Sequence, residues 1–289
     1  MLNDAMKSFI ALALKEDIGD GDVTSESSVP LGLVENGYIL AKEEGVVAGI
    51  KVAKEVFKQV DSSVSLNAVA SDGDRVKHGD VVIELEGPAR SILTGERLAL
   101  NFMQRMSGIA SRTDEIVSIL DGTPTKVLDT RKTTPGLRAF EKWAVTLGGG
   151  VNHRMGLYDM ILLKDNHVDY AGGMRAALMQ VSDYQNSRKQ KLPLVIETRS
   201  YDEIDTALSA SDKSGIEIDR ILLDNFSHDE VREAVRRYSD KVVLEASGGI
   251  TPENVRGYGD AGVAFVSLGY MTHSVKSLDL SLKSTPNVR

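Results

Sequence analysis

Cysteine is absent from this chain of 289 residues. Without thiols the protein can form no disulfide, no thiolate metal site and no cysteine nucleophile. Long apolar runs are also missing, because no stretch approaches the roughly 20 residues that span a bilayer. The apolar segment at the start is broken by Lys7 and Lys15 and has no small-residue cleavage site. We therefore expect no signal peptide and a cytoplasmic protein.

A positive net charge is lacking as well. Lys and Arg total 34 against 42 Asp and Glu, which gives a net charge of −8 and a pI near 5.3. An acidic surface argues against non-specific binding to nucleic acids or anionic membranes. An anionic ligand must therefore be held in a local basic cleft.

Several catalytic motifs are missing: a Walker-type phosphate loop, a His–Glu zinc helix and a Gly-x-Ser-x-Gly elbow. The single tryptophan, Trp143, is expected in the core or in a subunit contact. The composition is that of an ordinary globular protein with one or two domains, at 42% hydrophobic and 26% charged residues.

The first part of the chain mixes helical and strand patterns. Apolar spacing predicts a helix over 2–16, strands within 37–50 and 81–87, and a helix near 50–60. The segment 71–80 resembles the hairpin of a carrier domain, but it has no lysine flanked by methionines, so we interpret it as a turn. Residues 91–120 predict one long helix, or two in series with a break at Gly108.

Six short apolar runs follow, beginning at residues 126, 160, 194, 220, 242 and 265. Amphipathic helix-like segments separate most of them, for example 170–183 and 229–238. Alternating strands and helices predict a parallel sheet with crossover helices. Near-continuous apolar strands fit burial on both faces. Six units of this kind favour an α/β barrel or a partial barrel.

Each apolar run ends in polar residues, and the active site of such a barrel lies at the carboxyl ends of its strands. We therefore expect these polar groups to meet in one place. They comprise Asp129 to Lys132, Lys164 to Asn166, Glu197 to Arg199, Asp224, Asn225, Glu245, Ser247 and Ser267.

Basic residues are concentrated in this part of the acidic chain. Arg131 and Lys132 follow one strand, and His153 and Arg154 follow a glycine loop, so together they predict a site for a multiply anionic substrate. Lys164 ends a buried strand and needs an anion, either from a ligand or from Asp165 or Glu197. For Arg138 and Lys142, at helical spacing, we favour surface ion pairs.

Glu197 and Asp224 end successive strands. Two carboxylates suit Mg²⁺, which also takes waters and substrate phosphates. They could instead stabilise a developing cation, act as acid and base, or pair with Lys164. Farther along, Ser247, Gly248 and Gly249 precede an expected helix, and Gly269 and His273 follow the last strand. Both segments fit phosphate binding, with simple tight turns as the alternative.

The sequence resembles the quinolinate phosphoribosyltransferase family over nearly its whole length. The most specific likeness is "DTRKTTPGLRAFEKWAVTLGGGVNHRMGLYDMILLKDNH" at 129–167. It is accompanied, in the family's order, by "GERLALNFMQRMSGIAS", "LLDNF", "EASGGI" and "LGYMTHS". The chain departs from the family at Val195, where the family usually has a glutamate; the second acid, Glu197, is kept.

The resemblance implies a reaction and an architecture. Quinolinate and phosphoribosyl pyrophosphate would give nicotinate mononucleotide, pyrophosphate and CO₂, with Mg²⁺, in de novo NAD synthesis. An N-terminal α/β sandwich-like domain, 1–112 joined by 274–289, would accompany a (β/α) barrel-like domain, 113–273. The protein would be a homodimer in which Arg97 from the partner completes each active site.

By motif match the resemblance also assigns the site residues. Quinolinate would contact Arg97, Arg131, Lys132, His153, Arg154 and Lys164. Phosphoribosyl pyrophosphate would contact Lys164, Glu197, Asp224, Ser247, Gly248, Gly269 and His273. Lys132, Lys164, Glu197 and Asp224 would be catalytic, and Glu197 and Asp224 would hold the metal.

The sequence alone leaves three other interpretations open. The first is another phosphosugar-handling barrel enzyme, such as an isomerase or lyase. The second is a family-like protein that accompanies molybdate transport, which the presence of Arg97, Arg131, Lys132, His153 and Arg154 disfavours. The third is a carrier β domain with an appended barrel, which lacks any attachment lysine motif.

Overall fold

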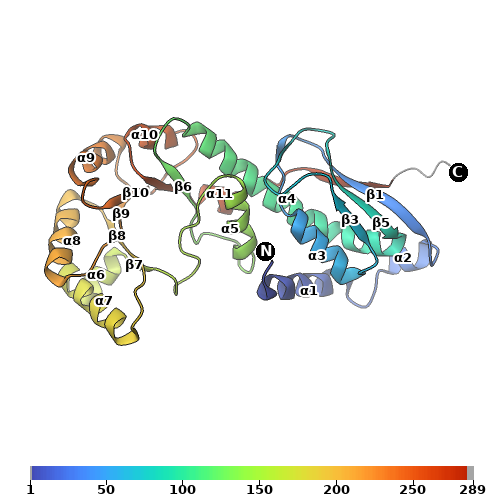
Figure 1. Ribbon diagram of the computed structural model, residues 1–289, viewed down its shortest axis with the longest axis horizontal. Coiled ribbons are helices and arrows are strands. Elements are labelled where there is room, and N and C mark those ends of the chain that lie inside the picture. The colour runs from blue at the N-terminus through green and yellow to red at the C-terminus, as the bar shows by residue number, and fades with distance from the viewer. Residues whose placement is uncertain (1, 285–289) are drawn as a thin grey trace. The chain divides into compact units, whose positions relative to one another are not determined.

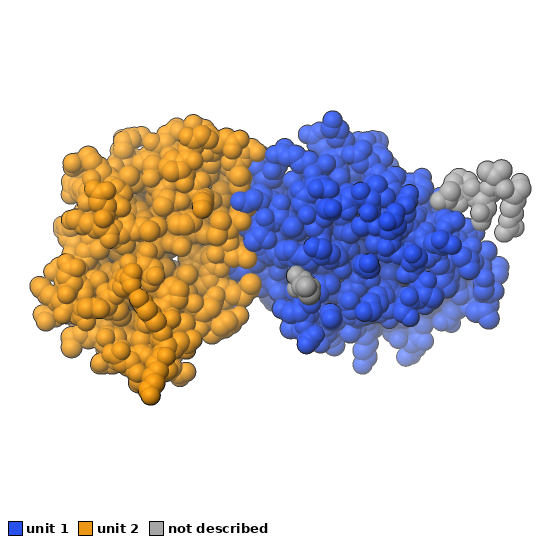
Figure 2. Space-filling model, viewed as in Figure 1, with its two compact units in different colours: residues 1–115, 133–149, 271–289 blue, residues 116–132, 150–270 orange. Residues whose placement is uncertain are grey.

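The computed structural model describes residues 2–284, and these form two compact units, coloured separately in Figure 2. Unit 1 comprises Met1–Glu115, Thr133–Gly149 and Met271–Arg289, and unit 2 comprises Ile116–Lys132 and Gly150–Tyr270. The domain limits expected from the sequence, 1–112 with 274–289 and 113–273, stay a prediction. The compact units differ from them chiefly because 133–149 packs with unit 1. Residues 285–289 lie outside the described residues.

Unit 1 contains a four-stranded antiparallel sheet in the order β12 (Leu280–Ser284), β1 (Val34–Ala41), β5 (Val81–Pro88), β3 (Ser65–Ala68). Alternate residues of β1 and β5 are buried, as expected for a sheet with one face against a core. A small second sheet pairs β2 (Gly45–Val46) with β4 (Arg75–Val76). The antiparallel sheet and its helices confirm the mixed α/β character that was expected of this part.

The helices of unit 1 confirm those predicted at 2–16 and near 50–60, and they include one at 23–28 where none was predicted. They are α1 (Asp4–Ile18), α2 (Val23–Ser28), α3 (Ile50–Val60) and α5 (Arg138–Leu147), with the short α11 (Tyr270–His273) at its boundary. The side chain of Asn3 caps α1 by accepting from the Met6 N–H. One face of α3, including Val52, Val56 and Phe57, is buried.

The long helix α4 (Ala89–Ile119) is unbroken, so the predicted alternative of two helices with a break at Gly108 was wrong. The presence of glycine at position 108 has another explanation. A Cβ atom at position 108 would lie 2.2 Å from the carbonyl oxygen of Lys276. Only glycine lets the chain after α11 approach the helix so closely.

Unit 2 is a parallel sheet of six strands, which confirms the predicted repeat. The order is β6 (Lys126–Leu128), β11 (Phe265–Ser267), β10 (Val243–Ser247), β9 (Arg220–Asp224), β8 (Leu194–Thr198), β7 (Ile161–Leu163). A parallel bridge between Leu128 and Val151 adds one more segment beside β6. The sheet is curved and barrel-like, with β6 and β7 at its ends in Figure 1.

The helices of unit 2 lie on the outer side of the curved sheet in Figure 1. They are α6 (Asp165–Ala171), α7 (Met174–Arg188), α8 (Tyr201–Ser214), α9 (His228–Tyr238) and α10 (Val255–Asp260). Ser200 and Ser227 cap α8 and α9 by accepting from the N–H of Glu203 and Glu230. None of the helices within residues 2–284 has the length and hydrophobicity of a transmembrane span.

Candidate active site

The strand register of unit 2 brings the polar strand ends to one edge, here called the carboxyl edge. Ser247 lies opposite Asp224, and Ser267 lies opposite Leu128. Glu197 lies opposite Leu222, two residues before Asp224. Because side chains two residues apart on a strand share a face, Glu197 and Asp224 point to the same side of neighbouring strands.

Arg131 and Arg154 are brought together by a short parallel ladder. The Val151 N–H donates to the Val127 carbonyl at 2.8 Å, and the Asp129 N–H donates to the Val151 carbonyl at 3.1 Å. The two basic loops therefore leave side by side. Burial, and secondly the positive charge of Arg131, lower the pKa of Arg154, while the nearby Asp159 acts in the opposite direction. Two like charges at one edge form a site suited to an anion.

His153 is buried between these loops, and both its backbone and its ring contact polar groups. Its backbone N–H donates to Asp129 Oδ1 at 2.8 Å, and its Nδ1 accepts from the Arg154 N–H at 2.7 Å. Its Nε2 lies 3.6 Å from Glu245 Oε2. An Nδ1 that accepts carries no proton, so the ring proton is on Nε2 and faces the carboxylate.

Lys164 and Glu197 form an ion pair across the ends of β7 and β8. Of the alternatives given for Lys164, the ion pair with Glu197 is therefore confirmed within the chain. The lysine side chain is 44% exposed and the glutamate side chain 14%. His167 Nδ1 accepts from the Lys164 backbone N–H at 3.1 Å. Lys164 thus keeps an open side at the carboxyl edge, where an anion can approach.

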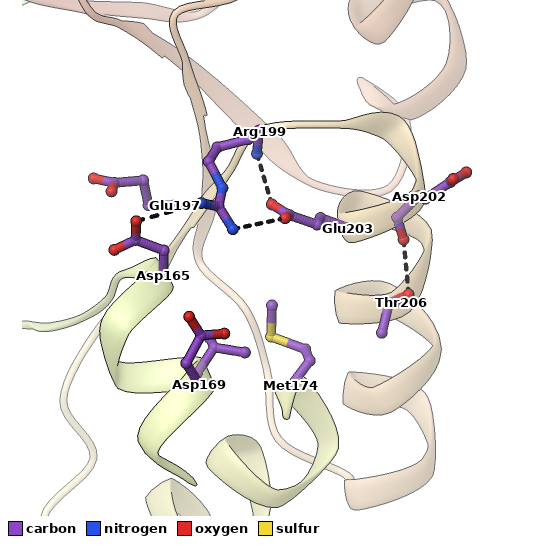
Figure 3. Close-up of a pocket in the computed structure, with 9 residues that line it drawn as sticks. Asp165, Asp169, Met174, Glu197, Arg199, Asp202, Glu203 and Thr206 are labelled. Atoms are coloured by element: carbon purple, nitrogen blue, oxygen red, sulfur yellow. Dashed lines mark hydrogen bonds and ion pairs between the residues drawn. The ribbon is translucent and has the colours of Figure 1, made fainter. Parts of the chain in front are cut away.

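A hollow of about 190 Å³ lies beside Glu197, between the helices that follow β7 and β8 (Figure 3). Arg199 points into it and pairs with Asp165 at 3.4 Å and Glu203 at 3.1 Å. The other lining residues are Val168, Asp169, Met174, Asp202 and Thr206. Its carboxylates outnumber its one cation, so this hollow does not suit a phosphate.

The loops after β9 and β10 interlock at the carboxyl edge. Asn225 has a left-handed backbone with φ of 58°, and its N–H donates to the Ser247 carbonyl at 2.8 Å. A Cβ at Gly248 would lie 2.2 Å from Asn225 Oδ1, so this position requires glycine. The helix expected after this loop is α10, which begins at Val255, and phosphate binding by the loop stays a prediction.

The described residues contain no group of three or more His, Cys, Asp or Glu arranged to hold a metal. Asp224 accepts from Asn225 Nδ2 at 2.9 Å, and Glu197 faces Lys164. Two carboxylates on one face still match what Mg²⁺ takes from a protein when waters and phosphates supply its other ligands.

Unit 2 holds most of the predicted site residues on its carboxyl edge or in the adjoining loops. These are Arg131, Lys132, His153, Arg154, Lys164, Glu197, Asp224, Ser247, Gly248 and Gly269. Arg97 and His273 belong to unit 1, where both are exposed. His273 Nδ1 lies 2.7 Å from Ser274 Oγ.

Two expectations about charged residues were wrong or incomplete. Lys142, expected in a surface ion pair, is 0% exposed on α5. Glu245, expected at the carboxyl edge, lies deeper and is completely buried. Arg220, which contacts it, was not singled out from the sequence. A glutamate inside an apolar run such as 242–246 was the available signal, since a buried charge needs a partner.

Comparisons with known proteins agree with this arrangement. The family model "Quinolinate phosphoribosyl transferase, N-terminal domain" matches residues 22–107, and the corresponding C-terminal model matches 109–283. A quinolinate phosphoribosyltransferase [decarboxylating] of Nicotiana glauca is 43% identical over 288 residues, covering 96% of this chain and 82% of its own. A probable nicotinate-nucleotide pyrophosphorylase [carboxylating] of Bacillus subtilis is 42% identical over 270 residues, covering 93% and 90%.

A solved structure shows the same fold. The nicotinate-nucleotide pyrophosphorylase of Francisella tularensis aligns with a TM-score of 0.92 and 35% identity, over 99% of this chain and 98% of its own. The match therefore includes both units in one chain. Taken with the motifs and the strand-end residues, it shows that the chain belongs to the quinolinate phosphoribosyltransferase family.

Proposed function

We propose that this protein transfers a phosphoribosyl group from phosphoribosyl pyrophosphate to quinolinate and removes one carboxyl group as CO₂. The products are nicotinate mononucleotide and pyrophosphate, in NAD synthesis. The observation that carries this proposal is the short parallel ladder that places the loops of Arg131 and Arg154 side by side at the carboxyl edge of a barrel-like sheet. Both substrates are polyanions, which explains a basic site on an acidic protein.

The basic half of the carboxyl edge recognises quinolinate, a dicarboxylate. Arginine presents paired N–H donors that match carboxylate oxygens, and lysine adds a mobile point charge. We assign this role to Arg131, Lys132, Arg154 and Lys164, with His153 between the two basic loops. In a homodimer, Arg97 of the partner subunit completes the set, which fits its exposure on α4.

The other half of the carboxyl edge receives phosphoribosyl pyrophosphate, through Lys164, Glu197, Asp224, Ser247, Gly248 and Gly269. We assign His273 to the same substrate. A bond forms between the ring nitrogen and C1 of the ribose while the C1–O bond to pyrophosphate breaks and its electrons leave with pyrophosphate. The sugar gains positive charge on the way, and Glu197 and Asp224 stabilise it electrostatically. We propose that Lys132 and Lys164 stabilise the negative charge that develops on the leaving pyrophosphate.

Decarboxylation follows from the first step. Once the ribose is attached, the ring nitrogen is cationic. The carbon–carbon bond to the neighbouring carboxylate then breaks, CO₂ leaves, and the electron pair stays on the ring carbon and takes a proton. No additional organic cofactor is needed for this step.

Magnesium is part of the proposal. Glu197 and Asp224 would hold Mg²⁺ together with waters and the pyrophosphate oxygens. When bound, the ion offsets the negative charge of the pyrophosphate. The cytoplasmic location and the dimer also stay predictions; the plant relatives' names include mitochondrial and chloroplastic enzymes.

A coupled assay for nicotinate mononucleotide tests the proposal. Purified protein is incubated with quinolinate, phosphoribosyl pyrophosphate and Mg²⁺, and in parallel with nicotinate in place of quinolinate. We expect product from quinolinate and far less from nicotinate. Product from nicotinate alone, or from neither base, would refute the assignment. Chelation by EDTA should abolish turnover, and added Mg²⁺ should restore it.

A further inference from the structure

A carboxylate that the proposed reaction does not use lies in the interior of unit 2. Glu245 is in the middle of β10 and is 0% exposed. Its Oε2 accepts from Arg220 Nη1 of β9 at 2.6 Å, and its Oε1 has no hydrogen-bond partner. The Arg220 guanidinium also lies 4.3 Å from the centre of the Phe265 ring. Burying a charge with one unsatisfied oxygen is costly, so the group calls for an explanation beyond stability.

The same oxygen of Glu245 faces His153. Its Oε2 lies 3.6 Å from Nε2, the ring nitrogen that carries the proton. A carboxylate behind a histidine fixes the tautomer and the direction of the ring. Glu245 thereby keeps Nδ1 unprotonated and turned towards the Arg154 N–H, from which it accepts at 2.7 Å.

His153 in turn connects the two arginine-bearing loops. Its backbone N–H donates to Asp129, a buried residue two positions before Arg131. Its ring accepts from the backbone of Arg154 itself. The charges of Arg131 and Arg154 disfavour each other, and these hydrogen bonds hold the two loops together against that repulsion.

We propose that Glu245, held by Arg220, is a positioning residue that acts through His153 to aim Arg154 at the dicarboxylate substrate. The inference rests on the proposed function, because it names how the same site is preorganised. Preorganised donors bind more tightly than mobile ones, since the cost of ordering them is met during folding. Glu245 touches no substrate in this account.

The test is the isosteric variant Glu245→Gln in the full-length chain. Quinolinate affinity is measured by calorimetric titration without phosphoribosyl pyrophosphate, so that no turnover occurs. We expect the Kd of quinolinate to rise about tenfold. This is the lower end of the effects measured for residues that hydrogen-bond to metal-ligating side chains and orient them. The Kd of phosphoribosyl pyrophosphate should stay within about twofold. Glu233→Gln, which changes a partly exposed carboxylate that also pairs with arginines, should leave both values unchanged.

A double-mutant cycle separates positioning from general loosening. If Glu245 acts through the histidine, the single variant His153→Asn and the double variant with Glu245→Gln should weaken quinolinate binding equally. A double variant whose increase in Kd equals the product of the two single increases would overturn the proposal. Should Glu245→Gln fold poorly, Glu245→Asp keeps the charge but withdraws it from His153, and it should raise the quinolinate Kd in the same way. If the wild type binds quinolinate tightly and the Glu245 variants bind it equally well, the positioning role is refuted and the proposed function stands. If the wild type does not bind quinolinate, the proposed function is refuted as well.

Discussion

Two buried glutamates, one in each unit, show how the same chemistry serves different purposes. Glu141 of unit 1 is 1% exposed and Glu245 of unit 2 is 0% exposed. Both accept from an arginine at 2.6 Å, Glu141 from Arg105 and Glu245 from Arg220. Glu141 also accepts from Arg105 Nε at 2.8 Å and, through its second oxygen, from the Thr134 N–H at 3.1 Å.

The difference lies in how completely each carboxylate is satisfied. Both oxygens of Glu141 have donors, so the residue ties the segment before α5 to α4 and serves the fold. Glu245 has one oxygen without a partner and shares the other between Arg220 and His153. A buried polar atom without a partner in a native structure calls for an explanation, and a functional role is one such explanation. Four experiments test this contrast or set it against other charged groups, from the largest expected effect to the smallest.

The largest effect on stability is expected when the ion pair between Arg105 and Glu141 is broken. Arg105→Met leaves Glu141 buried without its main partner, and removing one member of a buried ion pair costs about 3–5 kcal/mol. The free energy of unfolding, from urea titration followed by circular dichroism, should fall by that amount. A loss below about 1 kcal/mol would mean that Glu141 is not a structural support.

A comparable effect, on binding instead of stability, is expected at the carboxyl edge. Arg131→Ala should weaken quinolinate binding by at least about 30-fold, because losing one partner of a desolvated charge pair costs about 2–5 kcal/mol and each 1.4 kcal/mol is tenfold. Calorimetric titration measures the change. The matched variant Arg232→Ala removes an exposed arginine paired with Asp229 and should bind quinolinate like the wild type. Equal affinities of the two variants would contradict the assignment.

The two glutamine variants sharpen the comparison directly. A glutamine has one acceptor oxygen where glutamate has two. Glu141→Gln must therefore lose an acceptor for Arg105 or Thr134, at about 1–3 kcal/mol for a buried unsatisfied group. Glu245→Gln can place its NH₂ at the unpartnered position and should lose less stability. If thermal unfolding shows the opposite ranking, the contrast between the two residues fails.

The smallest effect concerns Glu233, a partly exposed carboxylate. Hydrogen bonds from Arg236 and then Arg237 lower the pKa of Glu233 from 4.5 to about 2. Because the folded pKa lies below the unfolded one, this stabilisation is complete above the unfolded value and is lost as the pH falls towards the folded value. The Tm difference between wild type and Glu233→Gln should be small at pH 6 and should shrink as the pH falls from about 4.5. A difference that grows on acidification would contradict the sign.

Much of the fold was predictable because local patterns carry it. The six apolar runs became β6 to β11, and the segment 91–120 became a helix, since periodicity reports which faces are buried. The role of Gly108 was not predictable, because it depends on the carbonyl of Lys276, far away along the chain. The packing of 133–149 with unit 1 depends likewise on the contact of Glu141 with α4.

The gathering of polar strand ends at one edge of the sheet was predictable from the sequence, but the contacts among their side chains were not. Polar residues at strand ends predicted the carboxyl edge, because parallel strands end on one side of a sheet. The pairing of Lys164 with Glu197 stayed one of three options until the register placed β7 beside β8. The contact of His153 with Glu245 joins a loop to a strand that follows it by about 90 residues, and no short-range pattern predicts it.

The most direct test of the account follows CO₂. Quinolinate labelled in the carboxyl group beside the ring nitrogen is incubated with the protein and Mg²⁺, with and without phosphoribosyl pyrophosphate. We predict labelled CO₂ only when phosphoribosyl pyrophosphate is present, in equal amount to the nicotinate mononucleotide formed, because the cationic ring nitrogen that permits decarboxylation exists only after ribosyl transfer. Labelled CO₂ released without phosphoribosyl pyrophosphate, or nicotinate mononucleotide formed without it, would contradict the account.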